Sequence, residues 1–279
     1  MIMIKSWVNG LCLLMLVGCS GDDGDSSPDR FTSCEQPVSR ASIRYEPAEN
    51  FHSTLLDADF PVYAYFPANW PSAEQALPVI YVLDGEWHFD SVAEAVDTLM
   101  IPAIVIGIGN DDSDGYAHRE RYFRLPDSRE YLDFLLGEFI PAMEQRFEQN
   151  ALARVLVGHS YSGLFVAQAP FMRPEAPEFY HYVSFDGSFW AHQRRTRDFI
   201  DEAGSLYAER ETSLWLIRAL VQPANDLDVQ WFGNLVRQKE FSSLAVYDDS
   251  FTEDHYALVR KSAESVVEAL ELETLCTSK

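Results

Sequence analysis

Short, continuous apolar segments alternate along this chain with longer segments of helical spacing, and this alternation limits the possible fold more than any other feature. The segments expected to form strands are 62–66, 79–83, 104–108, 155–157, 182–185, 214–220 and 244–247. The segments expected to form helices are 92–100, 131–147, 164–171, 229–239 and 256–270. Strands that alternate with helices build βαβ units, so the sequence predicts an α/β fold with a mostly parallel sheet and helices on both faces.

The N-terminus has the features of a bacterial lipoprotein export signal. Lys5 supplies a positive charge, and residues 11–17 are apolar but too few to span a bilayer. The segment LVGC at 16–19 is similar to a lipobox, whose cysteine is acylated and becomes the first residue of the mature chain. We therefore expect a signal peptide at 1–18 and a lipid on Cys19. The alternative is a chance cysteine in an ordinary secretory signal.

The lipid also predicts where the protein resides. Ser20 follows Cys19, and in Gram-negative lipoproteins a residue other than aspartate at this position implies sorting to the outer membrane. Residues 19–33 are mostly small, acidic and turn-forming, which is typical of a flexible tether, and the folded domain is expected at 34–279. We expect a periplasmic or surface-facing protein that contacts the outer membrane through its lipid anchor alone.

The net charge of −23 at pH 7 narrows the choice of partners. A surface this acidic repels phosphate backbones and anionic headgroups. Neither nucleic-acid binding nor electrostatic docking on a membrane is therefore expected, and the charge alone indicates no substrate.

The cysteines that remain for the folded domain are Cys34 and Cys276, because Cys12 leaves with the signal and Cys19 carries the lipid. An exported protein meets an oxidising compartment, and the two ends of a domain often lie close together. A disulfide between Cys34 and Cys276 is therefore favoured over two free thiols.

The segment GHSYSG at 158–163 lies between an expected strand and an expected helix, which is the setting of a nucleophile elbow. Ser160 is the candidate nucleophile, because a sharp strand-to-helix turn exposes its hydroxyl. The fifth position of the usual G-x-S-x-G pattern is Ser162, which is small and is followed by Gly163. His159 adjoins the nucleophile and is expected to pack rather than to act as the base. An ordinary β-to-α turn is the alternative interpretation.

The segment EDHY at 253–256 lies where the last expected strand meets the C-terminal helix. The chain order of this type of site places the base there, so His255 is the candidate general base. The other histidines form neither an HExxH motif nor a paired Cys/His spacing, and no metal site is expected.

The segment YVLDGEW at 81–87 leaves an early buried strand at the point where one oxyanion donor is usually found. A backbone N–H near Gly85 or Glu86, together with the N–H of Tyr161, is predicted to stabilise a tetrahedral oxyanion. Such donors contribute about 3 to 4 kcal/mol each. A plain turn at the strand end is the alternative.

Taken in order, these segments resemble the esterase branch of the α/β hydrolases that includes enterochelin esterases, S-formylglutathione hydrolases and related carbohydrate esterases. The resemblance covers about residues 50 to 272. It rests on YVLDGEWHF at 81–89, IPAIVIGIGN at 101–110, HRERYFRLP at 118–126, VGHSYSG at 157–163, SFDGSFW at 184–190 and EDHY at 253–256. It implies an α/β-hydrolase fold, a Ser-His-Asp/Glu triad, no cofactor, and hydrolysis of a small-molecule ester or thioester through an acyl-enzyme.

The acid of the triad is expected after the strand at 214–220, because in this fold the acid loop precedes the histidine loop. This segment lacks the Gly-x-x-Glu-like pattern of the family and offers Asp226 and Asp228. Asp226 ranks first, because its carboxylate either caps the following helix or reaches the nitrogen of His255 that faces away from Ser160. Asp228 is expected inside the first helical turn, where it favours the helix dipole. A dyad without an acid stays open.

The walls of the substrate pocket are predicted less sharply. The aromatic residues expected there are Trp87, Phe185, Phe189 and Trp190, which are equally consistent with a core position. Arg119 and Arg121 are candidates to orient an anionic substrate group, with a solvated pair of arginines as the alternative. Two other functions also stay open: a non-catalytic lipoprotein that keeps the fold as a binding module, and an acyltransferase with the same triad.

Overall fold

A computed structural model describes residues 48–68, 76–111, 116–148, 151–191, 193–204 and 211–275. The predicted signal peptide and tether, together with Cys19, Cys34 and Cys276, lie outside the described residues. The lipid, the disulfide and the domain boundaries therefore remain predictions. Within the described ranges, no helix is both long enough and apolar enough to cross a membrane.

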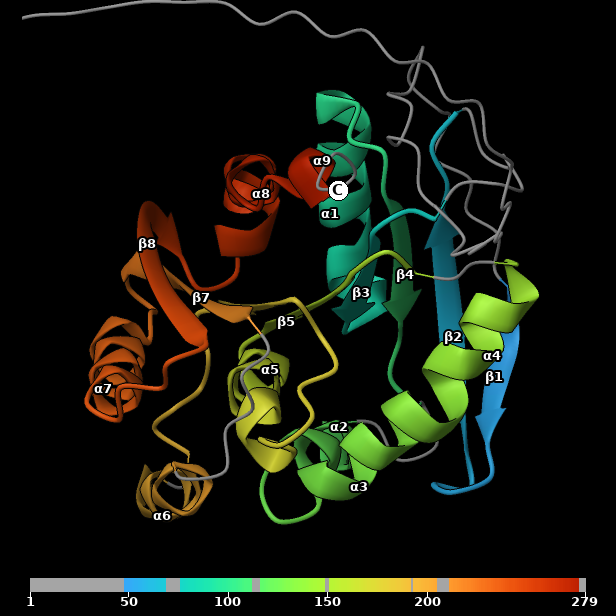
Figure 1. Ribbon diagram of the computed structural model, residues 1–279. Helices are drawn as coiled ribbons and strands as arrows, with labels where there is room; N and C mark the ends of the chain where they lie inside the picture. Colours follow the sequence, from blue (N-terminus) through green and yellow to red (C-terminus); the bar gives the residue numbers. More distant parts are fainter. Residues whose placement is uncertain are drawn as a thin grey trace, which may run out of the picture. The chain divides into compact units, whose positions relative to one another are not determined.

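The described strands form a sheet in the order β1-β2-β4-β3-β5-β6-β7-β8 (Figure 1). β1 (Ala48–Ser53) pairs antiparallel with β2 (Ala58–Tyr65), which pairs antiparallel with β4 (Ile104–Ile108). The other pairings are parallel. They involve β3 (Val79–Leu83), β5 (Arg154–His159), β6 (His181–Phe185), β7 (Thr212–Val221) and β8 (Leu244–Asp254). The predicted fold class, a mostly parallel α/β sheet, is confirmed.

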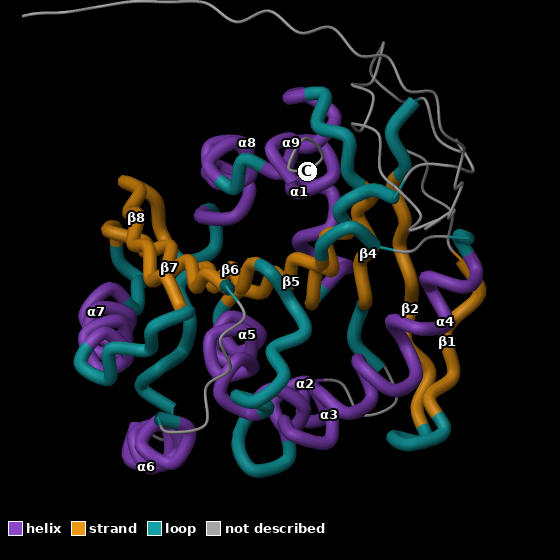
Figure 2. Tube along the Cα trace, in the orientation of Figure 1, coloured by secondary structure: helices purple, strands orange, loops and turns teal. Residues whose placement is uncertain are grey.

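Helices cover both faces of this sheet (Figure 2). One face carries α1 (Gly85–Leu99), α8 (Leu258–Ala269) and α9 (Leu272–Leu275). The other face carries α2 (Tyr116–Phe123), α3 (Ser128–Phe134), the π-helical turn η2 (Leu135–Phe139), α4 (Ile140–Arg146), α5 (Tyr161–Met172), α6 (Gln193–Ala203) and α7 (Asp226–Arg237). Each layer of helices encloses its own apolar core against the sheet.

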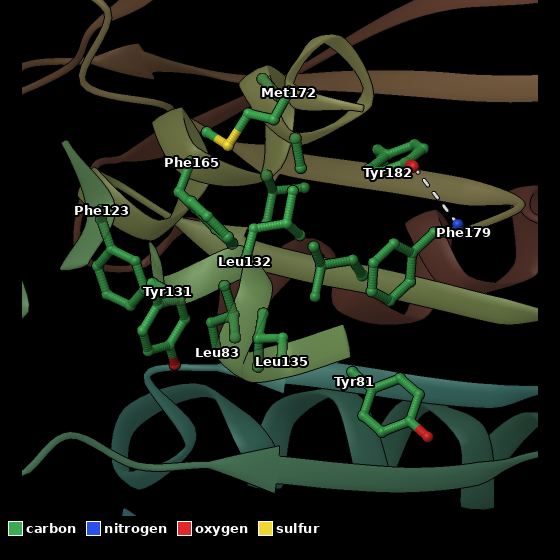
Figure 3. Close-up of a cluster of buried hydrophobic side chains, with 14 of the residues drawn as sticks. Tyr81, Leu83, Phe123, Tyr131, Leu132, Leu135, Phe165, Met172, Phe179 and Tyr182 are labelled. Carbon is green, nitrogen blue, oxygen red and sulfur yellow. Dashed lines mark hydrogen bonds between the residues drawn. The ribbon is translucent and has the colours of Figure 1, made fainter. Parts of the chain in front are cut away.

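The core beneath α5 is rich in aromatic side chains. Figure 3 shows Phe123, Tyr131 and Phe165 gathered there, with ring centroids 5.2 Å apart for Phe123 and Tyr131 and 5.4 Å apart for Tyr131 and Phe165. Aromatic rings at such distances add to the energy gained from burial. These contacts fix α2 and α3 against α5, the helix that begins directly after Ser160.

The sequence-based elements agree best with the structure where strands are buried on both faces. The expected strands at 79–83 and 104–108 match β3 and β4 at both ends, because continuous apolar runs end abruptly at turn residues. No sequence pattern predicted β1, α2, α6 or α9, which are short or predominantly polar. The expected helix at 131–147 is α3, η2 and α4 in succession.

The parallel strands bring four site residues to one edge of the sheet. Asp84 follows β3, Ser160 follows β5, Asp186 follows β6 and His255 follows β8. Because the carboxyl ends of parallel strands meet at the same edge, residues far apart in the sequence become neighbours there.

Candidate active site

Ser160 occupies a strained turn between β5 and α5. Its backbone has φ 61° and ψ −116°, a region that non-glycine residues rarely adopt. The turn is tight, because a Cβ on Gly158 would lie 2.5 Å from the Ser162 carbonyl oxygen and one on Gly163 would lie 2.9 Å from that of Phe185. The structure therefore places Ser160 in the strand-to-helix geometry that the sequence predicts for a nucleophile elbow.

Ser162, where the usual pattern has glycine, is part of this turn. Its hydroxyl accepts a hydrogen bond from the backbone N–H of His159 at 2.8 Å and lies 2.5 Å from Asp84 Oδ2, to which it donates. The side chain is buried. The serine thus links the elbow to the end of β3, a link that glycine at this position would lack.

His255 meets a buried aspartate that the sequence analysis did not select. His255 Nδ1 lies 2.7 Å from Asp186 Oδ2, and Asp186 has no exposed surface. The Asp186 carboxylate also accepts hydrogen bonds from the backbone N–H groups of Ala219 at 3.2 Å and Asn225 at 3.0 Å. Asp186 is therefore held in place on several sides and faces the histidine.

The prediction of Asp226 as the partner of His255 is wrong, and so is the alternative, Asp228. Asp226 forms an ion pair with Arg218 and accepts a hydrogen bond from Gln230, one helical turn further along α7. Asp228 accepts a hydrogen bond from Gln193 at 2.8 Å. The segment after β7 holds the acid in place instead of providing it, because Asn225 donates to Asp186 through its backbone N–H.

A signal for Asp186 was present in the sequence. The motif SFDGSFW at 184–190 places an aspartate followed by glycine directly after the strand at 182–185. Ser160 occupies the equivalent position after β5, and the two segments are adjacent: the Ser160 N–H donates to the Phe185 carbonyl at 3.0 Å. The expected chain order placed the acid after the following strand, β7, and so pointed away from Asp186.

Ser160 and His255 line the same cleft, which has a volume of about 420 Å³. The Ser160 hydroxyl lies 3.2 Å from the Ser188 hydroxyl. Ser160 and His255 are both described, and no hydrogen bond joins them. In an enzyme without substrate, the contact between nucleophile and base is often long and tightens when the substrate binds.

His159 packs against the candidate base. Its Nε2 lies 2.8 Å from the carbonyl oxygen of His255, and the two ring centroids are 4.3 Å apart. A carbonyl oxygen only accepts, so Nε2 of His159 must carry the proton. Burial, reinforced by the neighbouring histidines, holds the pKa of His159 well below its usual value, so this ring is uncharged at neutral pH.

His88 extends this row of histidine rings. Its ring centroid lies 4.8 Å from that of His159, and burial lowers the pKa of His88 to about 4. The Nε2 atom of His88 is buried and has no hydrogen-bond partner among the described residues. Among the described residues, His255 is the histidine of the cleft whose ring meets a carboxylate.

The predicted oxyanion donors differ in how close they lie to Ser160 and the cleft. Tyr161 opens α5 directly after Ser160, so its N–H has no acceptor within the helix. Gly85 and Glu86 open α1 but are not among the described residues that line the cleft, which begin with Trp87 on this side. The Glu86 carboxylate accepts hydrogen bonds from Asn110. Tyr161, Gly85 and Glu86 therefore remain predicted donors.

Arg119 lies at the cleft and Arg121 does not. Arg119 makes a two-point ion pair with Asp84, with distances of 2.6 and 2.7 Å, and both side chains are buried. Its guanidinium lies 5.2 Å from the ring centroid of Trp87. Arg121 is exposed and lies 3.6 Å from both Asp127 and Glu130.

Of the predicted aromatic walls, Trp87 lines the cleft. Phe185 and Phe189 are core residues with 2% and 0% of their surface exposed, and Phe189 stacks on Phe232 at 4.1 Å. Trp190 is 52% exposed and contacts Tyr161. Across the described part of the chain, no group of three or more His, Cys, Asp or Glu side chains is arranged to hold a metal ion.

The parallel sheet, the strained serine turn after β5 and the buried His-Asp pair at the same edge define an α/β-hydrolase type of fold and site. Residues 53–256 match the family described as "Putative esterase". This match covers most of the chain, so the protein belongs to that family.

Individual relatives share about half of their length with this chain. The ferri-bacillibactin esterase BesA of Bacillus subtilis (strain 168) is 28% identical over 138 residues, which are 39% of this chain and 48% of the relative. The siderophore triacetylfusarinine C esterase of Aspergillus fumigatus is 31% identical over 147 residues, 45% of this chain and 50% of the relative.

Solved structures share the fold at lower sequence identity. An IroE-like serine hydrolase from Shewanella oneidensis superposes with a TM-score of 0.67 at 21% identity, covering 84% of this chain and 80% of that one. This similarity supports the fold, and the roles of individual residues rest on the geometry of the site.

Proposed function

We propose that this protein is a serine carboxylic-ester hydrolase in which Ser160 is the nucleophile, His255 the general base and Asp186 the acid that orients it. The observation that carries this proposal is the 2.7 Å contact between His255 and the buried Asp186, in the cleft that the strained Ser160 also lines. A buried carboxylate beside a histidine near such a serine is the arrangement that acyl transfer requires.

The reaction would proceed in two steps. Asp186 accepts a hydrogen bond from Nδ1–H of His255, which leaves Nε2 unprotonated and free to take the proton of Ser160. The serine oxygen attacks the ester carbonyl, and His255 then gives the proton to the leaving alkoxide. In the second step His255 activates a water molecule that releases the acid and restores Ser160.

Two further residues would support this cycle. The backbone N–H of Tyr161 would bind the oxyanion of each tetrahedral intermediate, and a second donor would come from the Gly85–Glu86 segment. His159 would act as a positioning residue, because it fixes the main-chain carbonyl of His255 and stays uncharged beside the imidazolium that forms.

The substrates we propose are esters of the siderophore class. This step rests on the names of the two relatives, one an esterase of ferri-bacillibactin and the other of triacetylfusarinine C. Both names describe esterases. We propose further that the protein acts as a lipoprotein anchored to the outer membrane through Cys19.

The catalytic proposal is tested with a short p-nitrophenyl ester and a fluorophosphonate probe. Ser160→Ala and His255→Ala should each abolish hydrolysis while the protein remains folded, and Ser160→Ala should also abolish labelling. His118→Ala is a matched control, because His118 pairs with Asp111 at 2.8 Å but lies outside the cleft. More than about 1% residual turnover in Ser160→Ala would show that the nucleophile is misassigned.

Products and location need separate measurements. A panel of siderophore, carbohydrate and thioester substrates identifies the ester class, and product analysis with added alcohols separates hydrolysis from acyl transfer. Cys19→Ala should move the protein from the membrane fraction to the soluble fraction. Unchanged fractionation would contradict the lipid anchor.

A further inference from the structure

The cleft above Ser160 differs in charge from the chain as a whole. The chain has 44 aspartate and glutamate residues and a net charge of −23, yet none of the described residues that line the cleft is acidic. Arg119 and Arg260 line it instead. A cleft lined by one sign of charge raises the local concentration of ligands of the opposite sign.

The two arginines differ in whether their charge is already neutralised. Arg119 is buried and makes its two-point ion pair with Asp84. Arg260 is exposed, and within the described ranges it has no hydrogen bond and no ion pair. Glu264, one turn further along α8, is not paired with it. Arg260 is therefore a cation at the cleft whose charge no described residue neutralises.

The position of Arg260 on α8 does not favour the helix itself. The helix begins at Leu258, so Arg260 lies in its first turn, which contains no acidic residue. A cation at this end opposes the helix dipole. An anion bound at the Arg260 guanidinium would offset this unfavourable charge at the start of the helix.

The nearest carboxylate before Arg260 along the chain is already engaged elsewhere, because Asp254 Oδ1 accepts hydrogen bonds from the backbone N–H groups of Tyr256 and Ala257 at 2.9 Å. Burial lowers the pKa of His88 and of His159, so neither ring is charged at neutral pH. Trp87 and Tyr256 line the cleft with 45% and 79% of their surface exposed, which leaves aromatic surface for the uncharged part of a ligand.

We infer that Arg260 is a specificity-determining residue, which binds an anionic oxygen group of the ester substrate, such as a carboxylate. The inference rests on the proposed esterase function. The anion can belong to the acyl part or to the alcohol part of the ester, since both parts extend from the scissile bond into the cleft.

Two pairs of esters that differ only in one charge test this inference. In the first pair, p-nitrophenyl hydrogen adipate carries the anion on the acyl side and p-nitrophenyl methyl adipate is its neutral counterpart. In the second, p-acetoxybenzoate carries it on the alcohol side and methyl p-acetoxybenzoate is neutral. The measured quantity is the ratio of kcat/KM for the anionic member to that for the neutral member.

Arg260→Gln should lower this ratio about fivefold in at least one pair, through KM, while kinetics on the neutral ester stay within about twofold of wild type. Arg260→Lys should retain most of the preference, because the charge remains. Lys261→Gln is the matched control: it removes the same charge from the next, exposed position of α8, outside the lining of the cleft, and should not change the ratio. Added salt should narrow the difference between the wild-type ratio and that of Arg260→Gln, because it screens the attraction to the exposed guanidinium.

An unchanged ratio in Arg260→Gln for both pairs would overturn the inference, and so would an equal fall for both members of a pair. If the wild type hydrolyses the neutral esters, either result leaves the proposed esterase function intact. If the wild type hydrolyses none of the four esters and is not labelled by the fluorophosphonate probe, the proposed function fails and the role of Arg260 fails with it.

Discussion

Two buried aspartates at the carboxyl edge of the sheet have nearly the same backbone setting and different partners. Asp84 follows β3 and Asp186 follows β6, both with positive φ, at 53° and 43°, and both at most 1% exposed. Asp84 faces the guanidinium of Arg119, whereas Asp186 faces the imidazole of His255.

The partner determines what each carboxylate can do. Arginine stays charged at all ordinary pH values, and its two-point ion pair with Asp84 ties β3 to α2. In the proposed mechanism, by contrast, His255 takes the proton of Ser160 and Asp186 stabilises the imidazolium that forms. Similar backbone geometry therefore supports a structural clamp at one strand end and, in the proposed mechanism, acid-base chemistry at the other.

The largest expected effect concerns the pair of Asp186 and His255. Asp186→Asn should lower kcat by up to about 10⁴-fold without unfolding the protein, because the amide keeps the size of the side chain but fails to stabilise the imidazolium. Steady-state kinetics and a thermal melt measure the two quantities. Asp226→Asn is the control and should stay within about threefold of wild type, since its ion pair with Arg218 lies outside the site. A large loss of kcat in Asp226→Asn and a small one in Asp186→Asn would identify Asp226 as the acid.

The ion pair of Asp84 and Arg119 should affect stability more than chemistry. Asp84→Asn removes the two-point ion pair with the buried Arg119 guanidinium, and breaking a buried pair in this way typically costs about 3 to 5 kcal/mol of unfolding free energy. Denaturant titration measures this loss. Asp127→Asn removes an exposed partner of Arg121 and should cost less than about 1 kcal/mol. Equal losses in the two variants would mean that the burial of Asp84 has no energetic consequence.

The link between the clamp and the nucleophile should be weaker. Ser162→Ala removes the hydroxyl that donates to Asp84 and leaves a buried carboxylate short of one hydrogen bond, at a cost of about 1 to 3 kcal/mol. Ser162→Gly restores the usual family pattern and removes the same bond, so it should be no more stable than Ser162→Ala. A stabilised glycine variant would show that Ser162 does not support the turn.

The smallest expected effect is a pH dependence of the unfolding free energy, which comes from the buried His88. Burial lowers the pKa of His88 from 6.5 to about 4, so the unfolded chain binds a proton more readily than the folded one. The contribution of His88 to stability is complete above about pH 6.5 and is lost as the pH falls towards 4, by at most about 1.4 kcal/mol per pH unit. His88→Phe should therefore reduce the difference between unfolding midpoints measured at pH 7 and pH 5. An identical pH dependence in the variant would contradict this assignment.

Local sequence determined much of the framework. Continuous apolar runs located β3 and β4 at their ends, and the strand-turn-helix pattern around residues 158–163 placed Ser160 in its turn. His255 was selected from its place after the last strand. These features depend on neighbours within a few residues, which is why a pattern in the sequence contains them.

Only the tertiary structure decided which aspartate meets His255. Asp186 and Asp226 precede the histidine by 69 and 29 residues, and each directly follows or lies shortly after a parallel strand. The sheet order places β6 beside β5, so Asp186 lies next to the serine turn, while Arg218 on β7 binds Asp226. The pairing of Asp84 with Arg119 and the unpaired charge of Arg260 arise in the same way. Such contacts depend on how distant strand ends and helices meet in space, and no local periodicity records that.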